Sequence, residues 1–86
     1  MMQAQQPRKV IYRTNPVYPA VLKDKQIGGL VRIRVIVTPV GDVRQLQDIG
    51  GNPILVTAAE AAVKQWKFEP AANETHEIVT LRFGPN

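Results

Sequence analysis

The chain has 86 residues, enough for one small domain with a thin hydrophobic core. It contains no cysteine, which excludes disulfides and thiolate chemistry but leaves the cellular compartment open. The formal net charge of +4 is modest and spread along the chain, as is typical of a soluble surface. No apolar stretch approaches the roughly 20 residues of a membrane-spanning helix, so any membrane anchor is expected outside this chain.

The N-terminal part of the chain predicts a tail followed by a short helix. Residues 1–9 are polar and aperiodic, so we expect a tail or linker remnant ahead of one domain spanning 10–86. The run Thr14–Pro19 has two prolines three residues apart, which favours an extended lead-in to a helix. Pro19 suits the first helical position and Gly28-Gly29 suits the end, which predicts about two turns.

Two segments with frequent β-branched residues predict a β-hairpin. Residues 30–38 form the clearest strand, because apolar residues occupy every second position. Residues 39–42 have turn chemistry, so 43–49 should return as an antiparallel strand. Leu46 is out of phase with its apolar neighbours there, which predicts a β-bulge. The apolar face of the first strand should comprise Val31, Ile33, Val35 and Val37, with Arg32 and Arg34 opposite.

The C-terminal half predicts a longer helix and a third strand. Asn52 and Pro53 fit the cap and the first residue of the helix, while Thr57 begins a rival capping box. Pro70 is expected to end this helix, and residues 77–83 alternate as the last strand. The apolar helix stripe comprises Leu55, Ala59, Ala62, Val63 and Trp66, and the inward positions of the strand are Val79, Leu81 and Phe83.

The element order α-β-β-α-β predicts a two-layer α+β domain. We expect a three-stranded antiparallel sheet in the order 2-1-3, with both helices on one face. The first strand is the longest, so it should lie in the centre. A right-handed crossover then places the last strand at an edge, on the side away from the second strand.

Four motifs, in this order, resemble the family of TonB C-terminal domains. They are NPVYP (Asn15–Pro19), IGGLVRI (Ile27–Ile33), TPVGDV (Thr38–Val43) and AAEAAVKQWKFEP (Ala58–Pro70). Each motif alone is weak, but together they cover roughly residues 12–83 with the spacing of the family.

The resemblance implies a non-catalytic module in the periplasm, attached to the inner membrane through a segment outside this chain. There it would be coupled to the proton-driven ExbB–ExbD motor. The module would bind the TonB box, a short peptide of outer-membrane transporters, along the edge of its last strand. Edge strands offer unpaired backbone groups that suit such strand addition. The implied contact residues are Asn15, Val17, Ile78, Val79, Thr80, Leu81, Arg82 and Phe83.

Other uses of the domain stay open at this point. A basic sheet face with Arg32, Arg34 and Arg82 would suit RNA or an anionic surface, but no aromatic residue accompanies it, so nucleic acid is not expected. Two copies could instead pair through the same edge, or the domain could serve as an envelope sensor or assembly module. With a single histidine, no serine and no phosphate-binding loop, we expect no catalysis, metal or cofactor.

Overall fold

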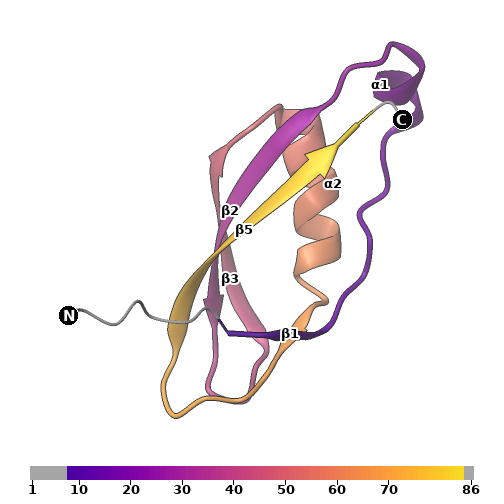
Figure 1. The fold of residues 1–86 in the computed structure, drawn as a ribbon. Helices are drawn as coiled ribbons and strands as arrows, with labels where there is room; N and C mark the ends of the chain where they lie inside the picture. The colour runs from indigo at the N-terminus through magenta and orange to yellow at the C-terminus, as the bar shows by residue number, and fades with distance from the viewer. Residues whose placement is uncertain (1–7, 85–86) are drawn as a thin grey trace, which may run out of the picture.

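The computed structural model describes residues 8–84. Strands β3, β2 and β5 form an antiparallel sheet in that order, and β1 and β4 pair separately as a two-stranded sheet (Figure 1). The α+β class and the strand order are confirmed, whereas the small second sheet was not predicted. In chain order the elements are β1 (Val10–Tyr12), α1 (Ala20–Asp24), β2 (Gly29–Val37), β3 (Val43–Gly50), α2 (Pro53–Val63), β4 (Lys67–Phe68) and β5 (Thr75–Phe83).

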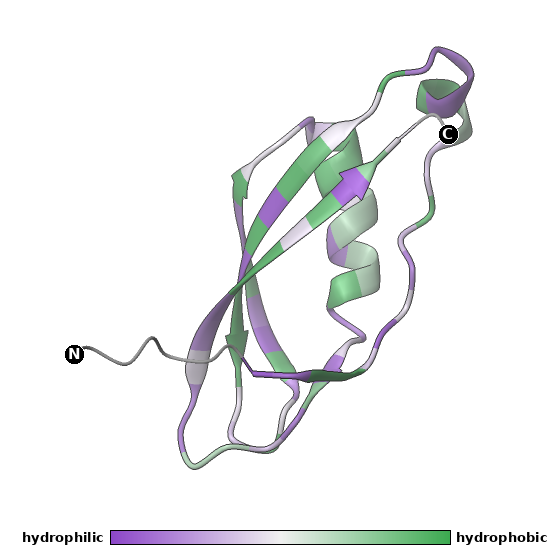
Figure 2. Ribbon diagram, viewed as in Figure 1, coloured by the Kyte–Doolittle hydropathy of each residue, from purple (hydrophilic) through white to green (hydrophobic). Residues whose placement is uncertain are grey.

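The hydrophobic core lies between β2 and α2. Alternating apolar and polar residues along β2 and β5 are visible in Figure 2, and the apolar side of β2 is completely buried. Removing these side chains from water is the main driving force for packing α2 on this face. α1 covers one end of the same apolar layer through Leu22. Within residues 8–84, neither helix is long and apolar enough to cross a bilayer. The largest fully buried side chains are those of Val31, Ile33, Val35, Val37, Leu55 and Val63.

The start of α2 is where Asn52 and Pro53 predicted it. The Asn52 side chain accepts hydrogen bonds from the backbone N–H groups of Ile54 (2.8 Å) and Leu55 (3.4 Å). These bonds satisfy donors that have no partner inside the helix. The rival start at Thr57 is wrong, because Thr57 lies inside α2 and its hydroxyl donates to the Pro53 carbonyl at 3.1 Å.

Both helices end earlier than the sequence predicted. In α1, Gln26 adopts the left-handed conformation at φ 57°, and Ile27 N–H donates to Leu22 O at 2.8 Å. Together with the bond from Gln26 N–H to Lys23 O (3.0 Å), this is a Schellman ending. Gly28 and Gly29 therefore do not end α1, and Pro19 precedes the helix as its N-cap rather than opening it.

The end of α2 at Val63 corrects the expected stop at Pro70. The backbone tightens there, since Trp66 N–H bonds to Val63 O at 2.9 Å. This turn buries the Trp66 side chain against the core and directs the chain into β4, where Phe68 pairs with Val10. The apolar stripe of the predicted helix thus continues into a turn and a short strand.

The two edges of the main sheet differ in regularity. β3 pairs with β2 through two register irregularities, between Arg32 and Ile33 and between Ile36 and Val37. The predicted β-bulge is confirmed, and it brings Leu46 against the core. β5 instead pairs with β2 in nine consecutive pairs, from Gly29–Phe83 to Val37–Thr75, without any shift.

The start of the described chain contacts the domain. Residues 1–7 of the expected tail lie outside the described residues. Arg8 and Lys9, which were also expected in that tail, make specific contacts with the domain. Arg8 is 9% exposed, and the Lys9 backbone N–H donates to the Glu69 carboxylate at 3.2 Å.

Candidate functional site

The edge of β5 that faces away from β2 is the candidate site. Among residues 8–84, β5 pairs with one strand only. Its central residues, Ile78–Leu81, border a groove instead of a second strand. A regular strand with a free side presents a row of backbone donors and acceptors to an incoming extended chain.

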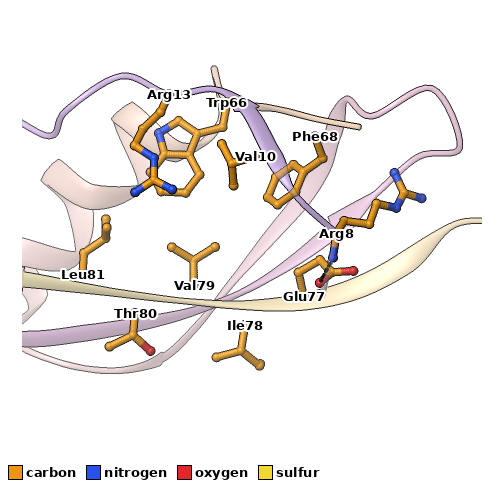
Figure 3. Close-up of a pocket in the computed structure, with 10 residues that line it drawn as sticks. All are labelled: Arg8, Val10, Arg13, Trp66, Phe68, Glu77, Ile78, Val79, Thr80 and Leu81. Atoms are coloured by element: carbon orange, nitrogen blue, oxygen red, sulfur yellow. Dashed lines mark hydrogen bonds between the residues drawn. The ribbon is translucent and has the colours of Figure 1, made fainter. Parts of the chain in front are cut away.

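A groove with a volume of about 200 Å³ separates this edge from residues 8–13, which we call the N-terminal strap. Figure 3 shows Val79 and Leu81 pointing into the groove toward Trp66 and Phe68, whereas Ile78 and Thr80 point away. The groove is therefore apolar at its centre. The strap contributes Arg8, Val10 and Arg13 to its lining.

Trp66 fixes the strap side of the groove. Its indole Nε1–H donates to the Thr14 carbonyl at 2.9 Å, and the Arg13 guanidinium lies 4.7 Å from the ring centroid. Buried tryptophan normally needs such a partner for its N–H, and a cation over the ring adds attraction. Trp66 and Phe68 lie tilted against each other with centroids 6.5 Å apart. These contacts hold the wall of the groove opposite β5 in place.

At the C-terminal end of β5, the side chains of Arg82 and Phe83 do not point into the groove, so the free edge there presents mainly backbone groups. Phe83 is buried and packs edge-on against Tyr18, with centroids 5.6 Å apart and an interplanar angle of 67°. Tyr18 in turn donates its hydroxyl to Ile27 O at 2.6 Å. The Arg82 side chain is exposed on the open face of the sheet. Of the six predicted β5 residues, Val79 and Leu81 therefore present side chains to the groove.

Asn15 and Val17 lie away from that groove, along α2. Both are exposed, Val17 by 78%, and both line a shallow hollow with Ala58 and Ala62. A second, more apolar hollow joins Val17 to Ile54 and neighbouring residues of α2. The structure thus brings the six β5 positions together and places Asn15 and Val17 on a separate surface, joined to the groove through Thr14.

The other edge of the main sheet is less suited to a guest strand. The register irregularities of β3 disturb the spacing of its backbone groups. Charged side chains also lie along β3, at Arg44 and Asp48. Bulges and charges are the usual protection of edges against unwanted pairing. β5 has neither at its centre.

The described residues contain no candidate metal site. Within residues 8–84, no three His, Asp or Glu side chains gather in a way that could hold a metal ion. Sequence reasoning missed the contribution of Arg8, Val10 and Arg13, because the strap is too short to show periodicity. The one sequence signal there was the pair of apolar residues Val10 and Ile11 between basic residues.

Comparisons with known proteins point in one direction. Residues 14–84 match the family model described as the Gram-negative bacterial TonB protein C-terminal. The TonB proteins of Escherichia coli K12 and Klebsiella pneumoniae are 31% and 29% identical over 80 residues, which is 91% of this chain in each case. The chain spans only 34% and 33% of their lengths.

A solved structure shares the fold. The solution structure of the Pseudomonas aeruginosa TonB C-terminal domain aligns with 93% of this chain and 86% of its own, at a TM-score of 0.65. Its sequence identity to this chain is 22%, so this likeness concerns the fold alone.

Proposed function

Because the chain belongs to the family of Gram-negative bacterial TonB C-terminal domains, we propose that it is the peptide-binding module of a TonB-type energy transducer. It acts in the periplasm, where it takes the TonB box of an outer-membrane transporter as an additional strand along β5. It works by binding and pulling, without catalysis. A part of the protein outside this chain anchors it in the inner membrane and couples it to ExbB–ExbD.

One observation carries the proposal: β5 is a regular nine-residue strand with a free edge and a ready-made groove beside it. A guest paired to Ile78–Phe83 satisfies their free backbone groups and directs alternate side chains toward Trp66 and Phe68. The outward positions Ile78, Thr80 and Arg82 then border the guest on the open face. Asn15 and Val17 contact a flanking part of the guest along α2.

An NMR titration with a TonB-box peptide tests this function. We expect chemical-shift changes in the backbone amides of Ile78–Phe83 and in the indole N–H of Trp66, with smaller changes near Asn15 and Val17. The affinity should be about micromolar or weaker, because a short strand buries less area than a standard interface. Shifts confined to β3, or none at saturating peptide, would refute the proposal.

The matched control changes the guest and leaves the protein intact. In an antiparallel or parallel pair, successive residues of a strand point their N–H groups to opposite sides. Methylating the peptide backbone nitrogens one at a time should therefore weaken binding at every second position only. Equal tolerance at all positions would mean that side chains, not backbone pairing, hold the guest. Self-pairing of two copies through β5 would appear as concentration-dependent shifts of the same amides before peptide is added.

Salt separates this mode from binding of a polyanion. A partner that contacts several phosphates loses about three orders of magnitude in affinity between low and moderate salt. Backbone strand addition to an apolar groove should change by less than about tenfold over the same range, since few charges are neutralised.

A further inference from the structure

Arg8 is the first described residue of the chain and a buried cation. Within residues 8–84 it is the single charged side chain classed with the buried residues, at 9% exposure. A buried guanidinium is costly unless its donors are paired. Both Nη groups of Arg8 reach acceptors, whereas its Nε–H has no acceptor among the described residues.

The Arg8 guanidinium donates to backbone carbonyls of two segments far away in sequence. Its short bonds are from Nη1 to Thr38 O at 2.7 Å and from Nη2 to Asn73 O at 2.6 Å. Longer contacts reach Glu69 O at 3.3 Å and Val37 O at 3.5 Å. Hydrogen bonds from a charged donor are stronger than neutral ones, and a planar fork holds its acceptors in a fixed geometry. One side chain thereby joins the end of β2 to the loop before β5.

The backbone of Arg8 adds a direct connection to β5. Its N–H donates to the Glu77 carboxylate at 3.3 Å, a bond drawn in Figure 3. The next residue continues the attachment, since Glu69 N–H donates to Lys9 O at 2.9 Å. Beyond these bonds, the strap is held through the stacking of Arg13 on Trp66 and through β1 and β4, a pair of strands with only three and two residues. So short a two-stranded sheet is marginal by itself.

We propose that Arg8 is the force-bearing anchor of the domain, the residue through which tension on the N-terminal side of the chain passes to the main sheet and β5. The inference rests on the proposed function, because only a transducer that pulls needs such an anchor. Without the anchor, tension peels the strap from β4 first. Peeling removes Val10 and Arg13 from the groove and so opens the guest site at the moment of load.

Single-molecule pulling tests the anchor. Since the chain has no cysteine, single cysteines give unique handles. Handles at Gln3 and Asn86 send the tension through Arg8. Handles at Ala61, on the exposed side of α2, and Asn86 bypass it. The measured quantities are the lifetime at constant force and the length of the first released segment.

The substitutions Arg8→Lys and Arg8→Met should shorten the lifetime about 10- to 100-fold with the Gln3 handle, as expected for the loss of two charge-assisted hydrogen bonds. With the Ala61 handle the same variants should change the lifetime much less. Lys9→Met removes an exposed charge from the neighbouring strap residue and should leave both lifetimes unchanged. An equal loss in both geometries would show that Arg8 is merely structural, and no loss with the Gln3 handle would remove its role.

The wild-type protein provides a test that does not depend on any variant folding. With the Gln3 handle, the anchor requires that the strap stays attached until the whole domain unfolds. A separate, low-force release of the strap before the main unfolding step overturns the proposal. Peptide affinity is measured without force, so a failure of peptide binding is distinguished from a failure of the anchor.

Discussion

Gly41 lies where the β2–β3 turn meets β4. Its φ is +99°, and a Cβ at this position would overlap the carbonyl oxygen of Phe68. The close approach has a purpose, because Phe68 N–H donates to Gly41 O at 2.8 Å and so ties β4 to the turn. A side chain here would meet both a disfavoured backbone conformation and a rigid backbone atom.

Replacing Gly41 by alanine should lower the free energy of unfolding by about 2 kcal/mol or more. Gly50 provides the matched control, since a Cβ there meets nothing within 4 Å and its φ is not positive. Gly50→Ala should change the stability by less than about 1 kcal/mol. Urea denaturation of both variants checks the difference, and similar losses at the two positions would contradict the reason given for Gly41.

For single residues, the sequence predicted which side chains are buried better than it predicted which distant residues they contact. The alternation in β2 identified Val31, Ile33, Val35 and Val37 correctly, because a strand with one buried face repeats every two residues. It gave no sign of the burial of Arg8, whose partners Thr38 and Asn73 lie 30 and 65 residues away. A long-range bond from a side chain to backbone carbonyls leaves no local pattern.

The N-terminus of α2 is the element whose start had two sequence interpretations. Asn52→Ala should destabilise the domain by about 1 kcal/mol, because the backbone N–H groups of Ile54 and Leu55 lose their acceptor. Thr57→Ala should cost less than about 0.5 kcal/mol, since the helix already includes Thr57 and alanine favours it. Thermal unfolding of both variants makes the comparison. A larger loss at Thr57 would place the functional cap there.

Element ends were the weakest part of the sequence prediction, and the physical reason differs between the two helices. Gln26 occupies a left-handed position that glycine normally fills, while Gly29, three residues later, begins β2. In α2, the apolar stripe continued past Val63 because Trp66 is buried from a turn, not from the helix. Periodicity records which side chains are buried, and a turn can bury a residue as well as a helix can.

For the whole molecule, the question is whether the small sheet unfolds with the large one. Trp66 and Phe68 belong to the same buried cluster as Val31 and Leu55, so the structure has one core shared by both sheets. Trp66, the single tryptophan, also bonds to Thr14 and reports on the strap. A shared core favours one cooperative transition.

Tryptophan fluorescence and far-ultraviolet circular dichroism should therefore give coincident unfolding curves in urea. The fluorescence reports on Trp66 and the strap, whereas the circular dichroism reports mainly on the longer strands and α2. An earlier fluorescence change would show that the strap and β4 form an independent, weaker unit. The Arg8→Lys variant is the informative comparison, because a weakened anchor should separate the two curves.

At this scale the architecture followed from the order of the elements, whereas the groove did not. The 2-1-3 order came from strand length and the handedness of crossovers, rules that hold for nearly all such sheets. The groove depends on the pairing of β1 with β4, where two very short strands meet only because the rest of the fold brings them together. The position of Asn15 and Val17 along α2 was likewise beyond local patterns.

The alternation along β5, with Val79 and Leu81 turned inward and Thr80 turned outward, has a consequence for how guests can evolve. A strand that extends this pleat repeats it, so only every second guest residue meets the aromatic wall. Mutations should accumulate freely at the intervening positions and be purged at the others. Under the proposed function, transporters that share one transducer should then conserve every second residue of the segment that pairs with β5 and vary at the residues between.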